Sequence, residues 1–169
     1  MKKFLLKFFK KPVRKIAFID GDQPMGETLY AYERFIADEG YETHFVRLRP
    51  SGHSEPKVLR KYDGVKDFNK IYIPQGQHFV SKEVVDKFIG AYIQKSISDG
   101  YDEIAVISSD YDFVDIFKMA AMIDESATNL TFRLIVPSPS ARHAGLPFKI
   151  NNIEIVKVKN AQTSNNPQD

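Results

Sequence analysis

Two short apolar runs, each followed at once by acidic residues, constrain the fold more than any other feature of the chain. Residues 16–19 read IAFI and lead into Asp20, and residues 103–108 read EIAVIS and lead into Ser109 and Asp110. A run of this length without polar alternation is typical of a strand that is buried on both faces. Such strands belong to parallel sheets that carry helices on both sides.

Helical patterns alternate with strand patterns along most of the chain. Apolar side chains recur at helical spacing in three segments, which we expect to be helices: 27–38, 82–98 and 113–124. Besides the two runs above, we expect strands at 43–48, 71–73, 131–136 and 152–158. Strands that alternate with helices predict an α/β domain with a mainly parallel sheet.

The acidic residues become informative in that context. Asp20 and Asp22 follow one buried strand, Asp110 and Asp112 follow another, and Asp86 lies in the early turns of an expected helix. Ligands of parallel sheets bind beyond the carboxyl ends of the strands, so these carboxylates are expected at one edge. Several carboxylates close together repel one another unless a cation neutralises them. Oxygen ligands without His or Cys suit Mg²⁺ or Mn²⁺, which support phosphoryl displacement.

Each acid also has a simpler interpretation. A single Asp at the end of a strand commonly forms a turn or caps a helix. Asp110 or Asp112 could cap the helix expected at 113–124, and Asp86 alone could be a solvated helix residue. The joint pattern, in which two DxD pairs each end a buried strand, favours a shared metal site.

Three motifs resemble a known family. The segments are FIDGDQ (18–23), KEVVD (82–86) and ISSDYDF (107–113). In this order they are similar to the DG-x-N, KG-VD and SGDxDF motifs of the NYN domain, in the LabA-like branch of the PIN-like nucleases. The resemblance spans about residues 15–136 and implies a Rossmann-like (PIN-like) three-layer α/β/α sandwich. It also implies a metal-dependent ribonuclease that hydrolyses RNA phosphodiester bonds, by endonucleolytic cleavage.

The family's functional residues are carried over by matching positions. The resemblance implies that Asp20, Asp86, Asp110 and Asp112 are catalytic and bind Mg²⁺ or Mn²⁺, with Asp22 as an auxiliary acid. Asp86 matches less closely than the other three, because the Gly of its motif is missing.

Two further site positions depart from the family pattern. Gln23 stands where the motif has Asn, and Ser109 stands where it has Gly. Both are auxiliary site candidates. Their replacement leaves an alternative open, a non-catalytic module of the same fold that binds RNA or protein.

A phosphatase of the haloacid-dehalogenase type is a second alternative. That family also begins with an apolar strand and a DxD pair, so Asp20 would be the nucleophile and Asp22 the general acid. Ser109-Asp110 with Asp115 imitates its later metal motif. Pro24 argues against this assignment, because the family usually has Thr or Val at that position.

Four residues near the acidic motifs are candidates for contact with substrate. Lys82, Lys87 and Lys118 could contact phosphates, and Tyr111 could stack on a base or ribose. The lysines equally fit solvated helix surfaces.

The charge of the chain is distributed unevenly. There are 24 basic and 22 acidic residues, but residues 1–15 hold 7 of the basic ones and no acid, so residues 16–169 have 17 basic against 22 acidic residues. We divide the chain into a basic amphipathic arm (1–14), the domain (15–159) and a polar, disordered tail (160–169). The apolar face of the arm comprises Phe4, Leu5, Phe8 and Phe9.

The arm has three interpretations. Residues 2–11 could lie on an anionic membrane surface, grip RNA phosphates, or pack on the domain or on a protein partner. The oligomeric state does not follow from the sequence.

Composition also bears on location. The chain contains no cysteine, which fits a reducing compartment and excludes disulfides and thiolate metal sites. It has no apolar run near the roughly 18 residues of a spanning helix. Lys7 interrupts the early apolar stretch, so a signal peptide is not expected. We therefore expect a cytoplasmic protein, peripheral at a membrane if the arm binds lipid.

Overall fold

A computed structural model describes residues 11–49, 55–74, 83–137, 149–150 and 152–158. Residues 1–10 of the arm and the whole predicted tail, 160–169, lie outside this part. Every helix and strand described falls within residues 15–159, the range predicted for the domain. None of the helices described is long and apolar enough to cross a membrane.

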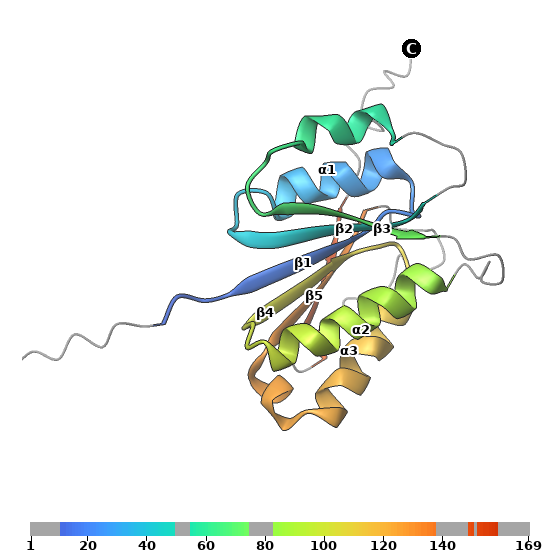
Figure 1. Cartoon of the computed structure of the whole chain (residues 1–169). Helices are drawn as coiled ribbons and strands as arrows, with labels where there is room; N and C mark the ends of the chain where they lie inside the picture. The colour runs from blue at the N-terminus through green and yellow to red at the C-terminus, as the bar shows by residue number, and fades with distance from the viewer. Residues whose placement is uncertain (1–10, 50–54, 75–82, 138–148, 151, 159–169) are drawn as a thin grey trace, which may run out of the picture.

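One sheet forms the centre of the molecule (Figure 1). Its described strands are β1 (Lys15–Asp20), β2 (Tyr41–Arg49), β3 (Phe68–Pro74), β4 (Glu103–Ile107), β5 (Thr131–Val136), β6 (Lys149–Ile150) and β7 (Ile153–Lys157). They lie in the order β3-β2-β1-β4-β5-β7-β6, and every neighbouring pair is parallel except β6 with β7. The order reverses between β1 and β4, which is where ligands bind in sheets of this kind.

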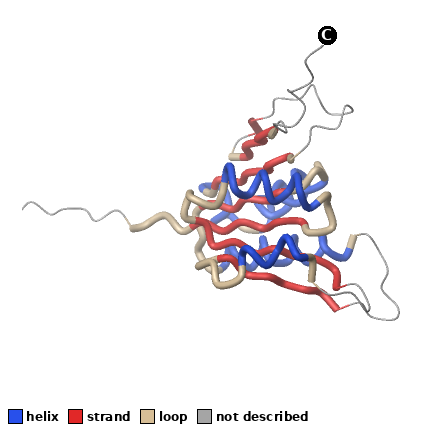
Figure 2. The backbone as a smooth tube through the Cα atoms, turned by 90° about the horizontal axis from the view of Figure 1, so that it is seen from above, coloured by secondary structure: helices blue, strands red, loops and turns tan. Residues whose placement is uncertain are grey.

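Helices cover both faces of the sheet (Figures 1 and 2). The helical segments are α1 (Met25–Phe35), η1 (Lys57–Tyr62), α2 (Val84–Ser98), α3 (Asp112–Ile123) and η2 (Glu125–Asn129). α1 and η1 lie on one face, while α2 and α3 lie on the other. The predicted fold class is confirmed: the chain is a Rossmann-like three-layer α/β/α sandwich with a mainly parallel sheet.

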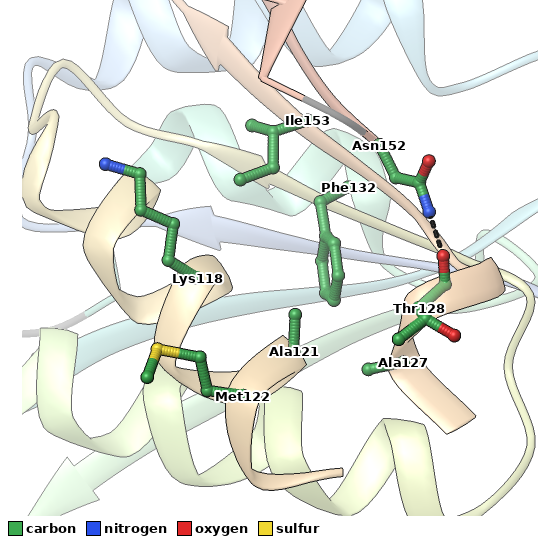
Figure 3. Close-up of a pocket in the computed structure, with 8 residues that line it drawn as sticks. All are labelled: Lys118, Ala121, Met122, Ala127, Thr128, Phe132, Asn152 and Ile153. Atoms are coloured by element: carbon green, nitrogen blue, oxygen red, sulfur yellow. Dashed lines mark hydrogen bonds between the residues drawn. The ribbon is translucent and has the colours of Figure 1, made fainter. Parts of the chain in front are cut away.

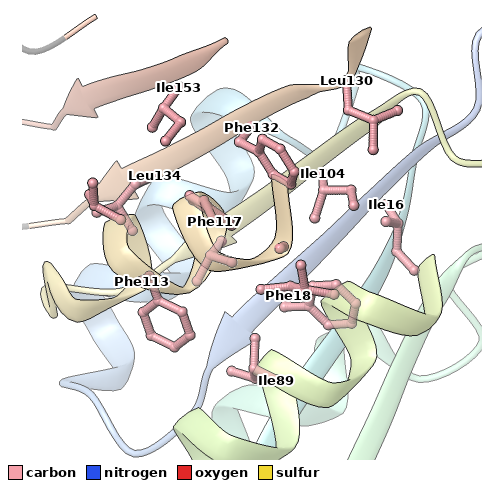
Figure 4. Close-up of a cluster of buried hydrophobic side chains, with 14 of the residues drawn as sticks. Ile16, Phe18, Ile89, Ile104, Phe113, Phe117, Leu130, Phe132, Leu134 and Ile153 are labelled. Carbon is pink, nitrogen blue, oxygen red and sulfur yellow. The ribbon is translucent and has the colours of Figure 1, made fainter. Parts of the chain in front are cut away.

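Each face of the sheet has its own hydrophobic core. On the α2–α3 side, Phe18 of β1 and Ile104 of β4 meet Ile89 of α2 and Phe117 of α3, all fully buried (Figure 4). The rings of Phe117 and Phe132 stack with their centroids 4.9 Å apart. Burying a side chain of this size contributes about 1.5–3 kcal/mol. The alternate residues of β1 and β4 belong to the core beneath α1, which explains why both strands read as solid apolar runs.

Element boundaries differ from the prediction by a few residues. The first helix was expected at 27–38 but begins at Met25 and ends at Phe35, and a turn then reaches Gly40 at φ 76°. α2 ends near the predicted residue because Gly100, at φ 77°, donates its N–H to the Ile97 carbonyl, while the Tyr101 N–H bonds the Ser96 carbonyl. This pair of bonds is the Schellman ending of a helix. β6, with only two residues, was not predicted.

The last residues of the arm are held at the amino end of the sheet. The Arg14 guanidinium lies 4.2 Å from the centre of the Tyr101 ring, and the Arg14 N–H donates to Asp102 at 2.8 Å. Before it, Lys11–Val13 lead away from the domain, and Val13 is 61% exposed (Figure 1).

Gly21 is where the chain leaves β1 for the acidic edge. Its N–H donates to the Val46 carbonyl of β2 at 2.7 Å. A Cβ on this residue would lie 2.6 Å from Cζ of Phe45 and 2.7 Å from the Val46 carbonyl oxygen. Glycine is therefore needed at this position for close approach of two backbones.

We expect Gly21→Ala to lower the free energy of unfolding by about 1–3 kcal/mol, because the added methyl group would collide with the backbone of β2. Gly26→Ala is the matched control, since a Cβ there meets nothing within 4 Å. That change removes a helical glycine and should raise stability by about 0.5–1 kcal/mol. Urea denaturation measures both, and equal effects would contradict the proposed close approach.

Candidate functional site

Asp20 ends the central strand and is buried with only 2% of its surface exposed. Its Oδ1 accepts the N–H of Asp22 at 3.1 Å, and its Oδ2 accepts the Ser108 hydroxyl at 2.8 Å. Burial raises the pKa of Asp20, while these two hydrogen bonds and one from Gln23 oppose the rise. The carboxylate is therefore fixed in orientation by donors from two loops.

Ser108 links the end of β4 to the end of β1. Its fully buried hydroxyl donates to Asp20 and accepts the N–H of Asp110 at 3.1 Å. In the next turn, Oδ1 of Asp110 accepts the N–H of Asp112 at 2.8 Å. Asp110 thus forms a local turn at the start of α3, but it does not cap the helix, whose N-cap position is Tyr111 without a side-chain cap.

Asp86 brings a carboxylate from α2 to the same place. It lies in the first turn of that helix and is half-buried. Burial, together with the negative charges of Asp20, Asp110, Asp112 and Asp22, raises the pKa of Asp86 to about 6. The other four carboxylates predicted from the sequence are therefore close enough to act electrostatically on Asp86.

The described acidic side chains do not form a coordination sphere for a metal ion as they are placed in this structure. Within the part of the chain that the structure describes, no group of three or more His, Cys, Asp or Glu residues is placed to hold a metal ion. The chemistry of the donors nevertheless fits a hard divalent cation, because all five are carboxylates whose mutual repulsion a cation would relieve. Asp20 is held by hydrogen bonds, whereas Asp112 is exposed and Asp110 is half-buried.

Asp22 faces β2 rather than the other acids. Its Oδ1 accepts the N–H of Leu48 at 3.4 Å. Burial raises the pKa of Asp22, and the nearby positive charge of Arg47 opposes that rise. Arg47 was not selected from the sequence, although its position near the carboxyl end of an expected strand could have indicated it. It contributes a cation at the acidic edge.

The two positions that depart from the family pattern contact each other. The hydroxyl of Ser109 donates a hydrogen bond to Oε1 of Gln23, joining the loop after β4 to the loop after β1. Asn is one carbon shorter than Gln, and Gly has no hydroxyl, so the family's usual pair could not make this contact. The two side chains therefore connect the loops that carry the first and the last of the three motifs.

The four predicted substrate-contact residues have different surroundings. Lys87 is exposed, pairs with Glu83 at 2.9 Å, and lines a groove together with Asp86 and Asp112. Tyr111 is half-buried and packs against the core on the α2–α3 side, which favours a packing role over stacking on a base. Lys82 lies outside the described residues.

Lys118 points to a different part of the molecule. Its Nζ lies 3.1 Å from Oδ1 of Asp115. The side chain lines a hollow of about 700 Å³ between α3, η2 and the strands β5 and β7. Phe132 and Ile153 form apolar walls of this hollow, and the Asn152 side chain is hydrogen-bonded to the Thr128 carbonyl across it (Figure 3). This placement does not support a contact between Lys118 and a phosphate at the acidic edge.

Comparison with known proteins bears on the fold alone. No family model matches the chain, and no curated protein matches its sequence. VPA0982 of Vibrio parahaemolyticus, a protein of unknown function, has a similar structure: the TM-score is 0.57 at 15% identity, over 89% of this chain and 96% of that one. LpCGTa, determined in complex with UDP, gives a TM-score of 0.38 at 13% identity, over 75% of this chain and 32% of that one, which is too low to compare sites.

The raised pKa of Asp86 predicts a stability that falls as pH rises. The folded protein holds this proton up to about pH 6, whereas the unfolded chain releases it near pH 3.9. The protonated carboxyl therefore stabilises the fold below about pH 4, and this contribution is lost as pH increases to about 6.

Asp86→Asn mimics the protonated form. We expect it to raise the free energy of unfolding by about 1 kcal/mol at pH 7.5, allowing for solvent screening, and to change it little at pH 4. Asp115→Asn is the control, because Asp115 is exposed and pairs with Lys118. Urea denaturation at both pH values measures the difference, and a loss of stability in Asp86→Asn at pH 7.5 would rule out net repulsion at this site.

Proposed function

We propose that the chain is a divalent-metal-dependent ribonuclease of the NYN type, which cleaves RNA at the edge where β1, β4 and α2 bring their acidic residues together. The observation that carries the proposal is the Ser108 hydroxyl, which bonds Asp20 and accepts the Asp110 N–H, joining two separate acidic motifs. The sequence motifs and the switch point between β1 and β4 support the same location.

Asp20, Asp86, Asp110 and Asp112 would hold Mg²⁺ or Mn²⁺, with Asp22 beside them. The cation would supply Lewis-acid activation of water and stabilise the charge that develops on the phosphate. The protein contributes orientation, because Asp20 cannot turn freely while Ser108 and the Asp22 N–H donate to it. Asp110 and Asp112 would offer carboxylates from the start of α3, where Oδ1 of Asp110 accepts the backbone N–H of Asp112.

Two cations near the acids are suited to contact phosphate. Arg47 acts electrostatically on Asp22, and Lys87 shares the groove with Asp86 and Asp112. RNA binding depends strongly on such contacts, because its backbone carries one negative charge per nucleotide. Arg47 is the stronger candidate, since Lys87 is already paired with Glu83.

A non-catalytic module on the same fold is the second candidate. The hydrogen bond between Ser109 and Gln23 favours it, because this contact occupies two side chains beside the acids. The separation of the described carboxylates points the same way. Such a protein would bind RNA or a protein partner without cleaving RNA.

The phosphatase alternative is disfavoured by the surroundings of Asp20. A nucleophilic carboxylate must reach the phosphorus atom of its substrate, but this one is 2% exposed and both of its oxygens accept hydrogen bonds. A phosphoryl group trapped on Asp20 would reverse this preference.

The decisive experiment compares RNA cleavage by the wild type, Asp110→Asn and Asp115→Asn in the presence of Mn²⁺ or Mg²⁺. We expect Asp110→Asn to lose cleavage by about a hundredfold or more, since it removes a charge from the metal site. Asp115→Asn should retain activity, because Asp115 lies one turn further along α3 and pairs with Lys118.

Calorimetry with Mn²⁺ separates the two candidates. Metal binding that is lost in Asp110→Asn supports the nuclease. Neither cleavage nor metal binding in the wild type, combined with RNA binding, would instead establish the non-catalytic module. Equal cleavage by the wild type and Asp110→Asn would show that the activity belongs to another site or to a contaminant.

A further inference from the structure

A groove runs along the outer surface of the α2–α3 layer. It encloses about 390 Å³, and its lining residues extend from Glu83 at the start of α2 to Gln94 in its third turn. The apolar part of its wall belongs to α3 and includes Ile116, Met119 and Ile123. The groove is therefore an open channel between two helices, with an apolar side along α3.

The end of α3 leaves large apolar side chains in water. Met119 is 60% exposed, Met122 is 85% exposed and Ile123 is 71% exposed. Met122 also lines the hollow on the other side of α3 (Figure 3). Three such residues within five positions form a contiguous apolar ridge between two concave surfaces, and patches of this kind mark interaction sites.

The charge of the groove restricts what can cover this ridge. Its charged lining residues are three acids, Glu83, Asp86 and Asp112, and one base, Lys87. Two of these acids, Asp86 and Asp112, belong to the candidate functional site, which the groove adjoins. Lys87 pairs with Glu83 at 2.9 Å. A suitable occupant is thus apolar on one side and positively charged.

The arm of this chain has that composition. Residues 1–11 contain five lysines and no acid, and Phe4, Leu5, Phe8 and Phe9 fall on one helical face. A helix over residues 2–10 would be about 14 Å long, and the eleven steps from Glu83 to Gln94 span about 17 Å along α2. The arm therefore matches the groove in length as well as in chemistry.

The direction of the chain indicates which copy supplies the arm. Arg14 is held against Tyr101 and Asp102, whereas Lys11–Val13 lead outward from the domain and Val13 is 61% exposed (Figure 1). The described residues before Arg14 thus lead away from this chain's own α2–α3 layer, so an arm that continues outward would be within reach of a second copy.

We propose that residues 2–10 of one molecule bind the α2–α3 groove of a second copy, with their Phe/Leu face on the ridge of Met119, Met122 and Ile123. Two molecules that exchange arms fill both grooves, which closes the assembly as a two-fold dimer. The proposal does not depend on nuclease activity, because the groove, the ridge and the arm are features of the fold and the sequence.

Disulfide trapping between chains tests the occupant directly. The chain has no cysteine of its own, so Phe9→Cys in one population and Met119→Cys in another leave a single thiol in each. After mixing and mild oxidation, we expect the mixed disulfide to exceed the background at least tenfold. Val58→Cys is the control partner, because Val58 is 44% exposed on η1, which covers the opposite face of the sheet.

Analytical ultracentrifugation of the full-length chain tests the energetics. Leu5→Gln combined with Phe8→Gln should weaken self-association by about a hundredfold, since two apolar anchors are lost. Leu6→Gln, which changes an apolar residue off that face, should weaken it little. On the groove side, Met119→Lys should dissociate the dimer, whereas Val58→Lys should not.

Several results would overturn the proposal. A chain that stays monomeric up to 200 µM, or a dimer that survives both Leu5→Gln/Phe8→Gln and Met119→Lys, excludes arm exchange. A disulfide that forms only within a chain carrying both cysteines assigns the groove to that chain's own arm. Binding to phosphatidylglycerol vesicles without self-association assigns the arm to a membrane surface instead.

Discussion

The exclusion of water from both faces of β1 and β4 determines most of this structure. These neighbouring strands each supply side chains to two separate cores, one beneath α1 and one beneath α2 and α3. A polar side chain inside either strand would lose its hydration without a partner, at a cost of about 1–3 kcal/mol or more. Polar residues therefore begin where the strands leave the core, and in a parallel pair the two exits lie side by side.

Asp20 is the acidic residue that lies deepest at this end of the sheet. Asp20 is the last residue of β1 and is still buried, so its carboxylate has lost most of its hydration. The hydrogen bonds from the Ser108 hydroxyl and the Asp22 N–H replace part of that hydration. Those donors connect the first acidic motif to the second, because Ser108 also receives the Asp110 N–H. The fold thereby holds like charges near one another and orients two of them with hydrogen bonds, and the remaining repulsion is what raises the pKa of Asp86.

The sequence was sufficient for the fold class because its strongest signals are local. The apolar residues that mark β1 and β4 in the sequence are the ones that the two cores bury. The same holds for the residues at helical spacing in α2 and α3. β6 escaped prediction because a two-residue strand has no periodicity, and the boundaries of α1 shifted because Pro24 and Gly40 act through backbone geometry.

The candidate site was predictable only in part, for a physical reason. The positions of Asp20, Asp110 and Asp112 follow from where buried strands end, and that of Asp86 follows from the start of α2, the helix between β3 and β4. The directions of side chains do not follow from such spacing. Lys118 and Arg47 illustrate this, since one turned out to line a separate hollow and the other, which was not selected, lies beside Asp22.

The acidic excess of the domain is partly explained by the cluster of carboxylates around Asp86. Part of the excess negative charge of the domain is concentrated at one edge, where Asp86 responds to four neighbouring carboxylates. Cations can reach these acids from solvent, because Asp112 is exposed and Asp86 and Asp110 are only half-buried. A divalent ion would act within the cluster, whereas lysines of an exchanged arm would act along the groove that begins at Glu83 and Asp86. In both proposed cases the cation would reduce the negative charge at this edge, and with it the repulsion of a polyanion.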